Sequence, residues 1–219
     1  MGIAVVLAAG VAPERERLAS AFDAELVVAA DGGLRAARQH DLRVDVVVGD
    51  LDSALDEDLA WARGAGATIV DYPSDKDATD LELAMAYADN AEGIDRILVF
   101  GVDGGRLDHE MGNWAVCCAP WRATVEVHAA GGIATILRSD RQRSMELRGE
   151  PGQTLSLIAR MGAARGVEVT GVRWPLHNAT LEAHSSLGIS NEFVEPVARV
   201  SVGEGVLVVV QPELADAAG

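Results

Sequence analysis

The chain of 219 residues has the length of one large domain or two small ones, and its 49% hydrophobic residues are enough for a packed core. This composition excludes a disordered chain, a collagen and a disulfide scaffold, and no apolar run reaches the ~18–20 residues that a membrane-spanning helix needs. The net charge of −16 comes without a basic stripe, which excludes a general nucleic-acid-binding surface.

The first 130 residues alternate short apolar runs with amphipathic segments. The runs are rich in valine and isoleucine and nearly continuous, which is typical of strands buried on both faces of a parallel sheet. They span residues 3–9, 25–30, 44–48, 68–72, 96–102 and 124–129, and the amphipathic segments lie near residues 13–22, 33–40, 55–65, 79–91 and 107–118. The alternation predicts an α/β domain over residues 1–130, with a doubly wound and mainly parallel sheet.

The helix expected over residues 79–91 carries the clearest local signals. Thr79 and Glu82 are spaced as a capping box, in which each side chain bonds a backbone N–H at the start of the helix. Four apolar residues then share one helical face: Leu81, Ala84, Met85 and Ala88. This spacing predicts a helix that begins at residue 79 or 80 and packs through that face.

The pattern changes after about residue 130. Short apolar runs, often alternating and separated by glycines, span residues 133–137, 154–159, 167–172, 179–183, 198–202 and 206–211. They predict a second, antiparallel β domain over residues 131–219, built as a small sandwich or barrel. The last residues, 215–219, are expected to fray.

Acidic residues follow four consecutive predicted strands of the first domain. Asp31 follows the second strand, Asp50 and Asp52 the third, and further carboxylates lie within residues 71–80 and 103–108. Each taken alone fits an ordinary turn or helix cap, but ligands of open α/β sheets bind at the carboxyl ends of the strands. Gathered carboxylates repel one another unless a cation neutralises them, and oxygen ligands suit Mg²⁺ that also contacts phosphates.

Missing motifs narrow the class of nucleotide-binding protein. The sequence has no Walker A motif, no G-x-G-x-x-G at its first helix and no G-x-S-x-G elbow. Its only lysine, Lys76, lies between Asp75 and Asp77, and either contacts a phosphate as a point charge or stands there by chance. The two cysteines are adjacent, Cys117 and Cys118, which favours a reducing, cytoplasmic location.

Several motifs, in their order and spacing, resemble those of the thiamine pyrophosphokinase (thiamine diphosphokinase) family. In the first half they are ADGG at residues 30–33, GDLDS at 49–53, DKDATD at 75–80 and GGRLDH at 104–109. The second half adds GVRWPL at residues 171–176 and GISNE at 188–192. The resemblance therefore covers almost the whole chain, from about residue 30 to residue 210.

The resemblance implies an enzyme that transfers the diphosphate group of ATP to the hydroxyl of thiamine, giving thiamine diphosphate and AMP with the help of Mg²⁺. It also implies an α/β catalytic domain that binds ATP and Mg²⁺, followed by a β-sandwich domain that binds thiamine. The family works as a homodimer, so thiamine is expected between the catalytic domain of one subunit and the β domain of the other.

The resemblance also assigns roles to individual positions. The expected ligands of Mg²⁺ are Asp50, Asp52 and Asp80, which together with Asp108 form the predicted catalytic set. The positions expected on the ATP side are Asp31, Gly32, Gly33, Lys76 and Arg106, and those on the thiamine side are Trp174, Ser190 and Asn191. A primary alcohol has a high pKa, so Asp108 or Asp31 is the candidate base for its proton.

Two other functions remain open from the sequence. The first is a related diphosphokinase that acts on another alcohol, such as a hydroxymethylpterin, because a planar pterin would also stack on Trp174. The second is a non-catalytic nucleotide-binding or regulatory protein with the same fold. The presence of all four predicted catalytic carboxylates argues against the second, since a binding module does not need every one of them.

Overall fold

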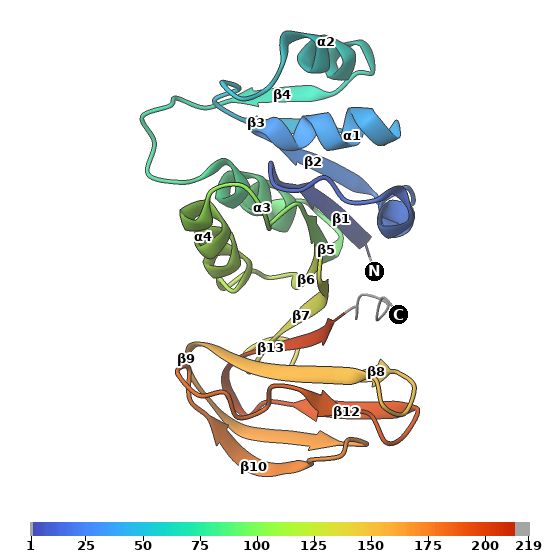
Figure 1. Ribbon diagram of the computed structural model, residues 1–219. Helices are drawn as coiled ribbons and strands as arrows, with labels where there is room; N and C mark the ends of the chain where they lie inside the picture. The colour runs from blue at the N-terminus through green and yellow to red at the C-terminus, as the bar shows by residue number, and fades with distance from the viewer. Residues whose placement is uncertain (1, 213–219) are drawn as a thin grey trace. The chain divides into compact units, whose positions relative to one another are not determined.

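The structure, a computed structural model, describes residues 2–212, so the expected fraying of residues 215–219 lies outside the described part. The chain divides into two compact units, unit 1 (residues 1–130) and unit 2 (residues 131–219) (Figure 1). Among residues 2–212, no helix combines the length and the hydrophobicity that crossing a bilayer requires.

The described part of unit 1 contains a sheet of six parallel strands, which confirms the predicted parallel sheet. The strands lie in the order β4-β3-β2-β1-β5-β6. Their bounds are β1 Gly2–Leu7, β2 Leu26–Ala30, β3 Val46–Gly49, β4 Thr68–Asp71, β5 Ile94–Phe100 and β6 Thr124–Ala129. The central strands are buried on both faces, which explains their continuous apolar runs.

Helices cover both faces of this sheet, so the predicted double winding is also confirmed (Figure 1). On one face, α1 (Leu34–His40) and α2 (Asp56–Gly64) share an apolar core with the 3-10 helix η1 (Arg15–Ala21). On the other face, α3 (Asp80–Asn90) packs on β1, β2, β3 and β5 and contacts α4 (Leu107–Cys117). A second 3-10 turn, η2 (Asp31–Gly33), links β2 to α1.

The start of α3 has the Thr79 half of the predicted capping box. Thr79 Oγ1 accepts a hydrogen bond from the Glu82 backbone N–H at 3.2 Å, and the four predicted apolar residues of this helix are buried. Asp80 is thereby the first residue of α3, where the helix dipole stabilises a negative charge. The cap therefore sets the position of the Asp80 carboxylate at the start of the helix.

The segment near residues 13–22 differs from the α-helical expectation, because it forms the 3-10 helix η1. Its two buried residues, Leu18 and Ala21, lie three positions apart, which suits the three-residue turn of a 3-10 helix. An amphipathic pattern over so few residues does not separate the two helix types.

Unit 2 is an antiparallel β-sandwich whose long strand β9 (Thr154–Thr170) belongs to both layers. In one layer, residues 156–160 of β9 pair with β13 (Glu204–Pro212), which pairs with β7 (Gly132–Arg138). In the other layer, residues 164–170 pair with β10 (Leu176–Leu181) and β12 (Val197–Ser201), and β12 pairs with β8 (Ser144–Arg148). Side chains from both layers form one apolar core.

The sequence predicted two strands over residues 154–159 and 167–172, and the structure has the single strand β9 in their place. The chain bends within one continuous strand, at Met161 and Gly162, whose φ angles of 59° and 122° are left-handed. A glycine in this stretch therefore allows a bend rather than ending the strand. Two strands without an expectation are β8, in which Leu147 is the buried side chain, and the two-residue β11 (Asn191–Glu192).

Strand β6 carries a partly buried ion-pair group that stabilises unit 1. Glu126 accepts a hydrogen bond from Arg96 at 2.5 Å and lies 2.7 Å from His128 Nε2. The His128 ring in turn packs on Phe100, with 4.6 Å between ring centroids. Burial by itself raises the pKa of Glu126, but the bonds from His128 and Arg96 outweigh it and hold the pKa below its ordinary value.

We expect Glu126→Gln to lower the free energy of unfolding at pH 7 by about 1–3 kcal/mol, because it removes a charged acceptor from two partners. The folded-state pKa lies below the ordinary value of 4.5, so the contribution of the carboxylate is full above that pH. It disappears as the pH falls through the folded-state pKa. Urea denaturation of both proteins between pH 7 and pH 3 measures this loss.

The matched control is Glu57→Gln, which removes an exposed partner of Arg38 in the same unit. A surface change of this kind should alter the unfolding free energy by no more than about 0.5 kcal/mol. Equal losses for the two variants, or a gap that does not narrow in acid, would contradict the role assigned to Glu126.

Candidate functional site

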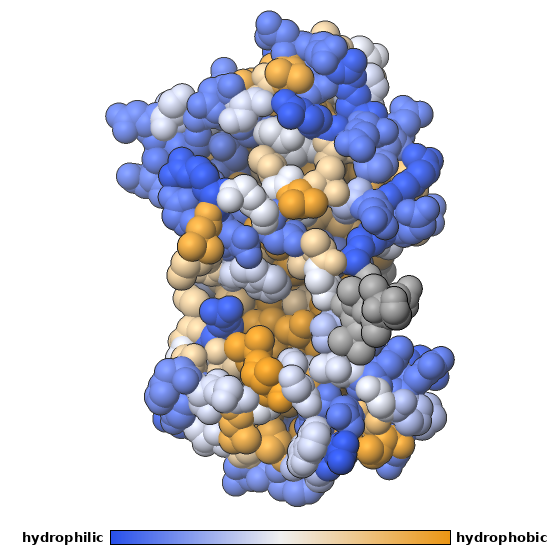
Figure 2. All heavy atoms as spheres, in the orientation of Figure 1, coloured by the Kyte–Doolittle hydropathy of each residue, from blue (hydrophilic) through white to orange (hydrophobic). Residues whose placement is uncertain are grey.

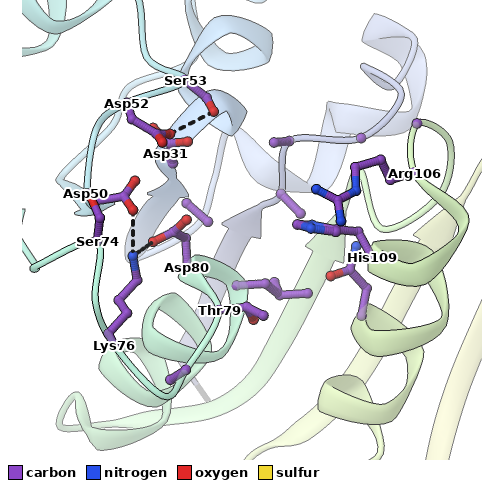
Figure 3. A pocket seen from close by; sticks show the side chains of 18 of the residues that line it. Asp31, Asp50, Asp52, Ser53, Ser74, Lys76, Thr79, Asp80, Arg106 and His109 are labelled. Atoms are coloured by element: carbon purple, nitrogen blue, oxygen red, sulfur yellow. Dashed lines mark hydrogen bonds and ion pairs between the residues drawn. The ribbon is translucent and has the colours of Figure 1, made fainter.

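A cavity of about 450 Å³ opens at the carboxyl ends of the strands of unit 1 (Figure 3). The segments that follow β1 to β5 all contribute to its lining. In chain order, the lining includes Ala8–Gly10 after β1, Asp31 after β2, Asp50, Asp52 and Ser53 after β3, Ser74 and Lys76 after β4, and Arg106 and His109 after β5. The parallel sheet therefore brings the predicted acidic segments to one edge. This agrees with the rule, here called the strand-end rule, that ligands of open α/β sheets bind at the carboxyl ends of the strands.

Three carboxylates form a cluster within this cavity. Asp31, Asp50 and Asp52 can each bring one oxygen within 4.8 Å of the others, and Ser53 Oγ donates to Asp52 Oδ1 at 3.0 Å. Two of the three belong to the predicted set of Mg²⁺ ligands. The third predicted ligand, Asp80, lies beside the cluster, while Asp31, expected on the ATP side, is part of it.

Asp31 is the most unusual member of the cluster. Its side chain is buried, with 5% of the residue exposed, and within residues 2–212 no hydrogen-bond donor reaches its Oδ1. Burial, reinforced by the negative charges of Asp80 and Asp52, raises the pKa of Asp31. A buried carboxylate oxygen without a partner calls for a ligand, and the set of three carboxylates fits a hard divalent cation.

Lys76 lies between two of the carboxylates. Its Nζ donates to Asp50 Oδ2 at 2.9 Å and forms an ion pair with Asp80 Oδ1 at 3.1 Å. The bond from Lys76 lowers the pKa of Asp50, and the same bond raises the pKa of Lys76. Lys76 is thus paired with carboxylates in the cavity, and its expected contact with a phosphate stays a prediction.

Strained backbone fixes the direction of the clustered carboxylates. Leu51, between the two aspartates of the GDLDS motif, has a φ of 62°, and Asp31 has a φ of 41°. A left-handed angle is costly for a leucine, less so for an aspartate, and persists where the surroundings impose it. The Leu51 side chain packs against the core of unit 1, which anchors the turn while the residues on either side of it line the cavity.

Gly49 leaves the space that the cluster occupies. Its φ of +149° disfavours other residues, and a Cβ there would lie 3.0 Å from both Asp31 Cβ and Asp80 Oδ1. In the ADGG motif, a Cβ on Gly33 would lie 2.1 Å from the Leu7 carbonyl oxygen, and the expected contact of Gly32 and Gly33 with ATP stays a prediction. Gly33 therefore permits close packing of η2 on β1.

Arg106 and His109 lie across the cavity from the carboxylates (Figure 3). Asp108, predicted as catalytic, is not brought together with the cluster. Its carboxylate is 65% exposed and accepts hydrogen bonds from Arg106 Nη2 at 2.6 Å and from Arg106 Nε at 3.1 Å. The bonds from Arg106 lower the pKa of Asp108 to about 2, which makes this carboxylate a weak base at neutral pH.

The predicted thiamine-side residues lie together in unit 2, where Asn191 holds Trp174. The Trp174 backbone N–H donates to Asn191 Oδ1 at 3.1 Å, and Asn191 Nδ2 donates to the Trp174 carbonyl at 2.7 Å. Asn191 is 4% exposed, so its amide is used to support the backbone. Ser190 has a left-handed φ of 58°, and its N–H donates to Ser156 Oγ at 3.0 Å.

The Trp174 ring itself is accessible. The residue is 52% exposed, and the Arg173 guanidinium lies over the ring at 4.8 Å while it pairs with Glu192 at 2.9 Å. Hydrophobic side chains also gather on the face of unit 2 in view, whereas hydrophilic ones cover much of the face of unit 1 (Figure 2). The exposed apolar residues of unit 2 include Met161, Leu187, Ile189 and Val194.

Several lining residues were not found from the sequence. The segment Ala8–Gly10 follows the first strand, so the strand-end rule applied to that strand would have found it. Asn113, which lines the cavity and donates to the Val102 carbonyl at 2.9 Å, lies one helical turn after His109, and this spacing was a usable signal. Ser53 closes the GDLDS motif, but Ser74 carried no signal beyond its closeness to acidic residues.

Two family models match the chain. Residues 19–129, just over half of the chain, match the model described as "Thiamin pyrophosphokinase, catalytic domain". Residues 142–207 match the model described as "Thiamin pyrophosphokinase, vitamin B1 binding domain".

Individual relatives carry the same description. The chain is 26% identical to a thiamine pyrophosphokinase of Bacillus subtilis over 172 residues, covering 74% of this chain and 76% of that one. It is 31% identical to thiamine pyrophosphokinase 1 of Oryza sativa over 166 residues, covering 72% and 62%. Among solved structures, the thiamin pyrophosphokinase of Geobacillus thermodenitrificans is similar with a TM-score of 0.76 at 25% identity, over 99% of each chain.

We expect Gly49→Ala to lower the free energy of unfolding by about 1–3 kcal/mol, because the added methyl group both strains the backbone and crowds Asp31 and Asp80. The control is Gly64→Ala, since nothing lies within 4 Å of a Cβ at that position. It should leave stability unchanged or raise it slightly. Urea denaturation of the two variants measures the difference, and equal stabilities would contradict the crowding at Gly49.

Proposed function

Because the chain belongs to the thiamin pyrophosphokinase family, we propose that it transfers the diphosphate group of ATP to the hydroxyl of thiamine. The products are thiamine diphosphate and AMP. The observation that carries the proposal is the carboxylate cluster in the strand-end cavity, which lies within the segment that matches the catalytic-domain model. Unit 2, which contains the segment matching the B1-binding model, supplies the acceptor side.

We further propose that Mg²⁺ binds in this cavity, held by Asp31, Asp50 and Asp52 with Asp80 alongside. The support is the buried Asp31 oxygen, for which residues 2–212 offer no hydrogen-bond donor, together with the all-oxygen donor set. When bound, Mg²⁺ would neutralise charge on the transferring phosphates.

In the transfer, the hydroxyl oxygen of thiamine forms a bond to the β-phosphorus of ATP, and the bond from that phosphorus to the bridging oxygen of AMP breaks. Phosphoryl-type transfer demands little covalent chemistry of the protein and depends on positioning and charge. Arg106 and His109, opposite the carboxylates, are placed to contact phosphate oxygens from the other wall. The hydroxyl loses its proton in this step.

Neither predicted base has the surroundings of a free carboxylate at neutral pH. Asp108 is held by Arg106 with a pKa of about 2, and Asp31 belongs to the cation cluster. Of the two, Asp31 is the one that lines the cavity, which favours it as the proton acceptor. Charge neutralisation and alignment, rather than a strong base, would account for most of the rate enhancement.

For the acceptor, we propose that the ring of thiamine stacks on Trp174, with cation–π attraction to its positive charge. The half-exposed indole on a backbone held by Asn191 supports this role. We also propose a homodimer, supported by the exposed apolar side chains of unit 2. The cytoplasmic location stays a prediction from sequence, with both cysteines buried as thiols.

The test of the activity is AMP release from ATP with and without thiamine, with thiamine diphosphate measured in the same sample. We expect both products, in equal amounts, only when thiamine and Mg²⁺ are present, and neither after the divalent cation is chelated. Product formation with a hydroxymethylpterin in place of thiamine would identify a different acceptor. ATP binding without AMP release for either alcohol would show a non-catalytic protein.

Trp174→Ala should raise the KM for thiamine about fivefold or more, because a lost stacking contact costs about 1–3 kcal/mol. The KM for Mg·ATP and the kcat should stay within about twofold of the wild-type values, since of the two substrates the ring would contact only thiamine. Trp174→Phe, which keeps an aromatic face, should retain most of the affinity. Steady-state kinetics with each substrate varied in turn measures these values, and an unchanged thiamine KM in the alanine variant would show a structural role.

A further inference from the structure

Lys76 is the only lysine in the chain, and its ammonium lies against two carboxylates of the proposed cation site. It is 2.9 Å from Asp50 Oδ2 and 3.1 Å from Asp80 Oδ1, and its side chain is 14% exposed. The lysine belongs to the segment between β4 and α3, where its backbone N–H donates to the Ser74 carbonyl at 3.1 Å. The ammonium is therefore part of the cavity wall and not a surface charge.

The position of Lys76 gives Asp50 two competing cationic partners, the lysine and the proposed divalent cation. Asp50 belongs both to the cluster with Asp31 and Asp52 and to the ion pair with Lys76. A divalent cation bound by the cluster and an ammonium bound by the same carboxylate repel each other. Both positive charges cannot use Asp50 fully at the same time.

The cluster also needs a positive charge when no divalent cation is bound. Asp31, Asp50, Asp52 and Asp80 lie at one edge of the sheet, and without a cation their mutual repulsion would raise pKa values and push the side chains apart. Lys76 supplies this charge to the two carboxylates that it contacts. Its flexible stem and compact ammonium allow it to leave again.

We propose that Lys76 is a positioning residue that acts as a resident counter-ion: it holds Asp50 and Asp80 in place in the cation-free protein, and an arriving divalent cation displaces it. The displaced ammonium stays at the cavity wall, where it can contact the phosphates of the nucleotide. This inference rests on the proposed function, because a divalent cation in this cavity is part of that proposal. In this proposal, Lys76 neutralises the carboxylates in the cation-free protein and a phosphate after the cation has bound.

The wild-type protein allows a direct test, because selective ¹³C-lysine labelling marks one side chain in the whole chain. In the cation-free protein, the Lys76 ε-methylene signal should differ from that of free lysine, since the side chain is held between two carboxylates. Addition of Mg²⁺ alone should move this signal in a saturable way, toward the position of a mobile lysine. Sodium chloride at equal ionic strength is the control and should not reproduce the change.

The outcomes of this titration are distinct. Saturable Mg²⁺ binding, measured by calorimetry, with an unmoved Lys76 signal overturns the displacement while the proposed function stands. No Mg²⁺ binding to the folded protein overturns the displacement and the proposed cation site together. Thiamine-dependent AMP release, measured separately, tests the reaction itself and does not depend on the lysine signal.

A pair of variants separates displacement from a general effect of charge. If Lys76 leaves the carboxylates in about a tenth or less of the cation-free molecules, Lys76→Met should bind Mg²⁺ about tenfold or more tightly than the wild type. Arg106→Met removes a positive charge from the opposite wall, where the arginine pairs with Asp108 instead, and should tighten binding far less. Calorimetry with Mg²⁺ alone measures both affinities.

Two results of that comparison would overturn the proposal. Equal tightening in the two variants would show a general Coulomb effect, and unchanged or weaker binding in Lys76→Met would show that the lysine supports the cation site without competing for it. Lys76→Arg keeps a positive charge between the carboxylates and should bind Mg²⁺ with near wild-type affinity. The wild-type titration stays decisive if a variant fails to fold.

Discussion

The mutual repulsion of carboxylates at one edge of a parallel sheet is the constraint on which the site of this protein depends. Parallel strands place the segments that follow them side by side, and here those segments carry aspartates. Three features of the cavity reflect or oppose this repulsion. Asp31 is held with a raised pKa, Lys76 neutralises Asp50 and Asp80, and the turn at Leu51 holds its backbone against the core.

The local backbone is as important to this arrangement as the charges. Gly49 leaves room for Asp31 and Asp80 to approach, and the cap at Thr79 sets the first residue of α3 at Asp80. Gly49 has no side chain that could contact a substrate, and the Thr79 hydroxyl accepts the capping bond from Glu82. They determine where the carboxylates lie, so their substitution would act on the site through geometry rather than through lost chemical groups.

The sequence allowed the fold class and the edge of the sheet to be predicted, because buried parallel strands and helix caps leave strong local patterns. The side-chain pairings were beyond it. Asp80 was expected as a cation ligand and is paired with Lys76, whereas Asp31 was expected near ATP and lies in the carboxylate cluster. Asp108 shows the same limit, because its pairing with Arg106 depends on a contact at the start of α4 that no sequence spacing reveals. In unit 2, the bend at Met161 hid the continuity of β9.

That continuity has a mechanical consequence for unit 2. Because β9 hydrogen-bonds to β13 along one part and to β12 and β10 along another, neither layer of the sandwich can slide or peel away without pulling the strand from the other. We therefore expect the backbone amides of the two layers to open in a single cooperative event. Hydrogen exchange in the interior of both layers should then proceed with one common protection, including in β9 and β10, the strands that flank the turn of Trp174.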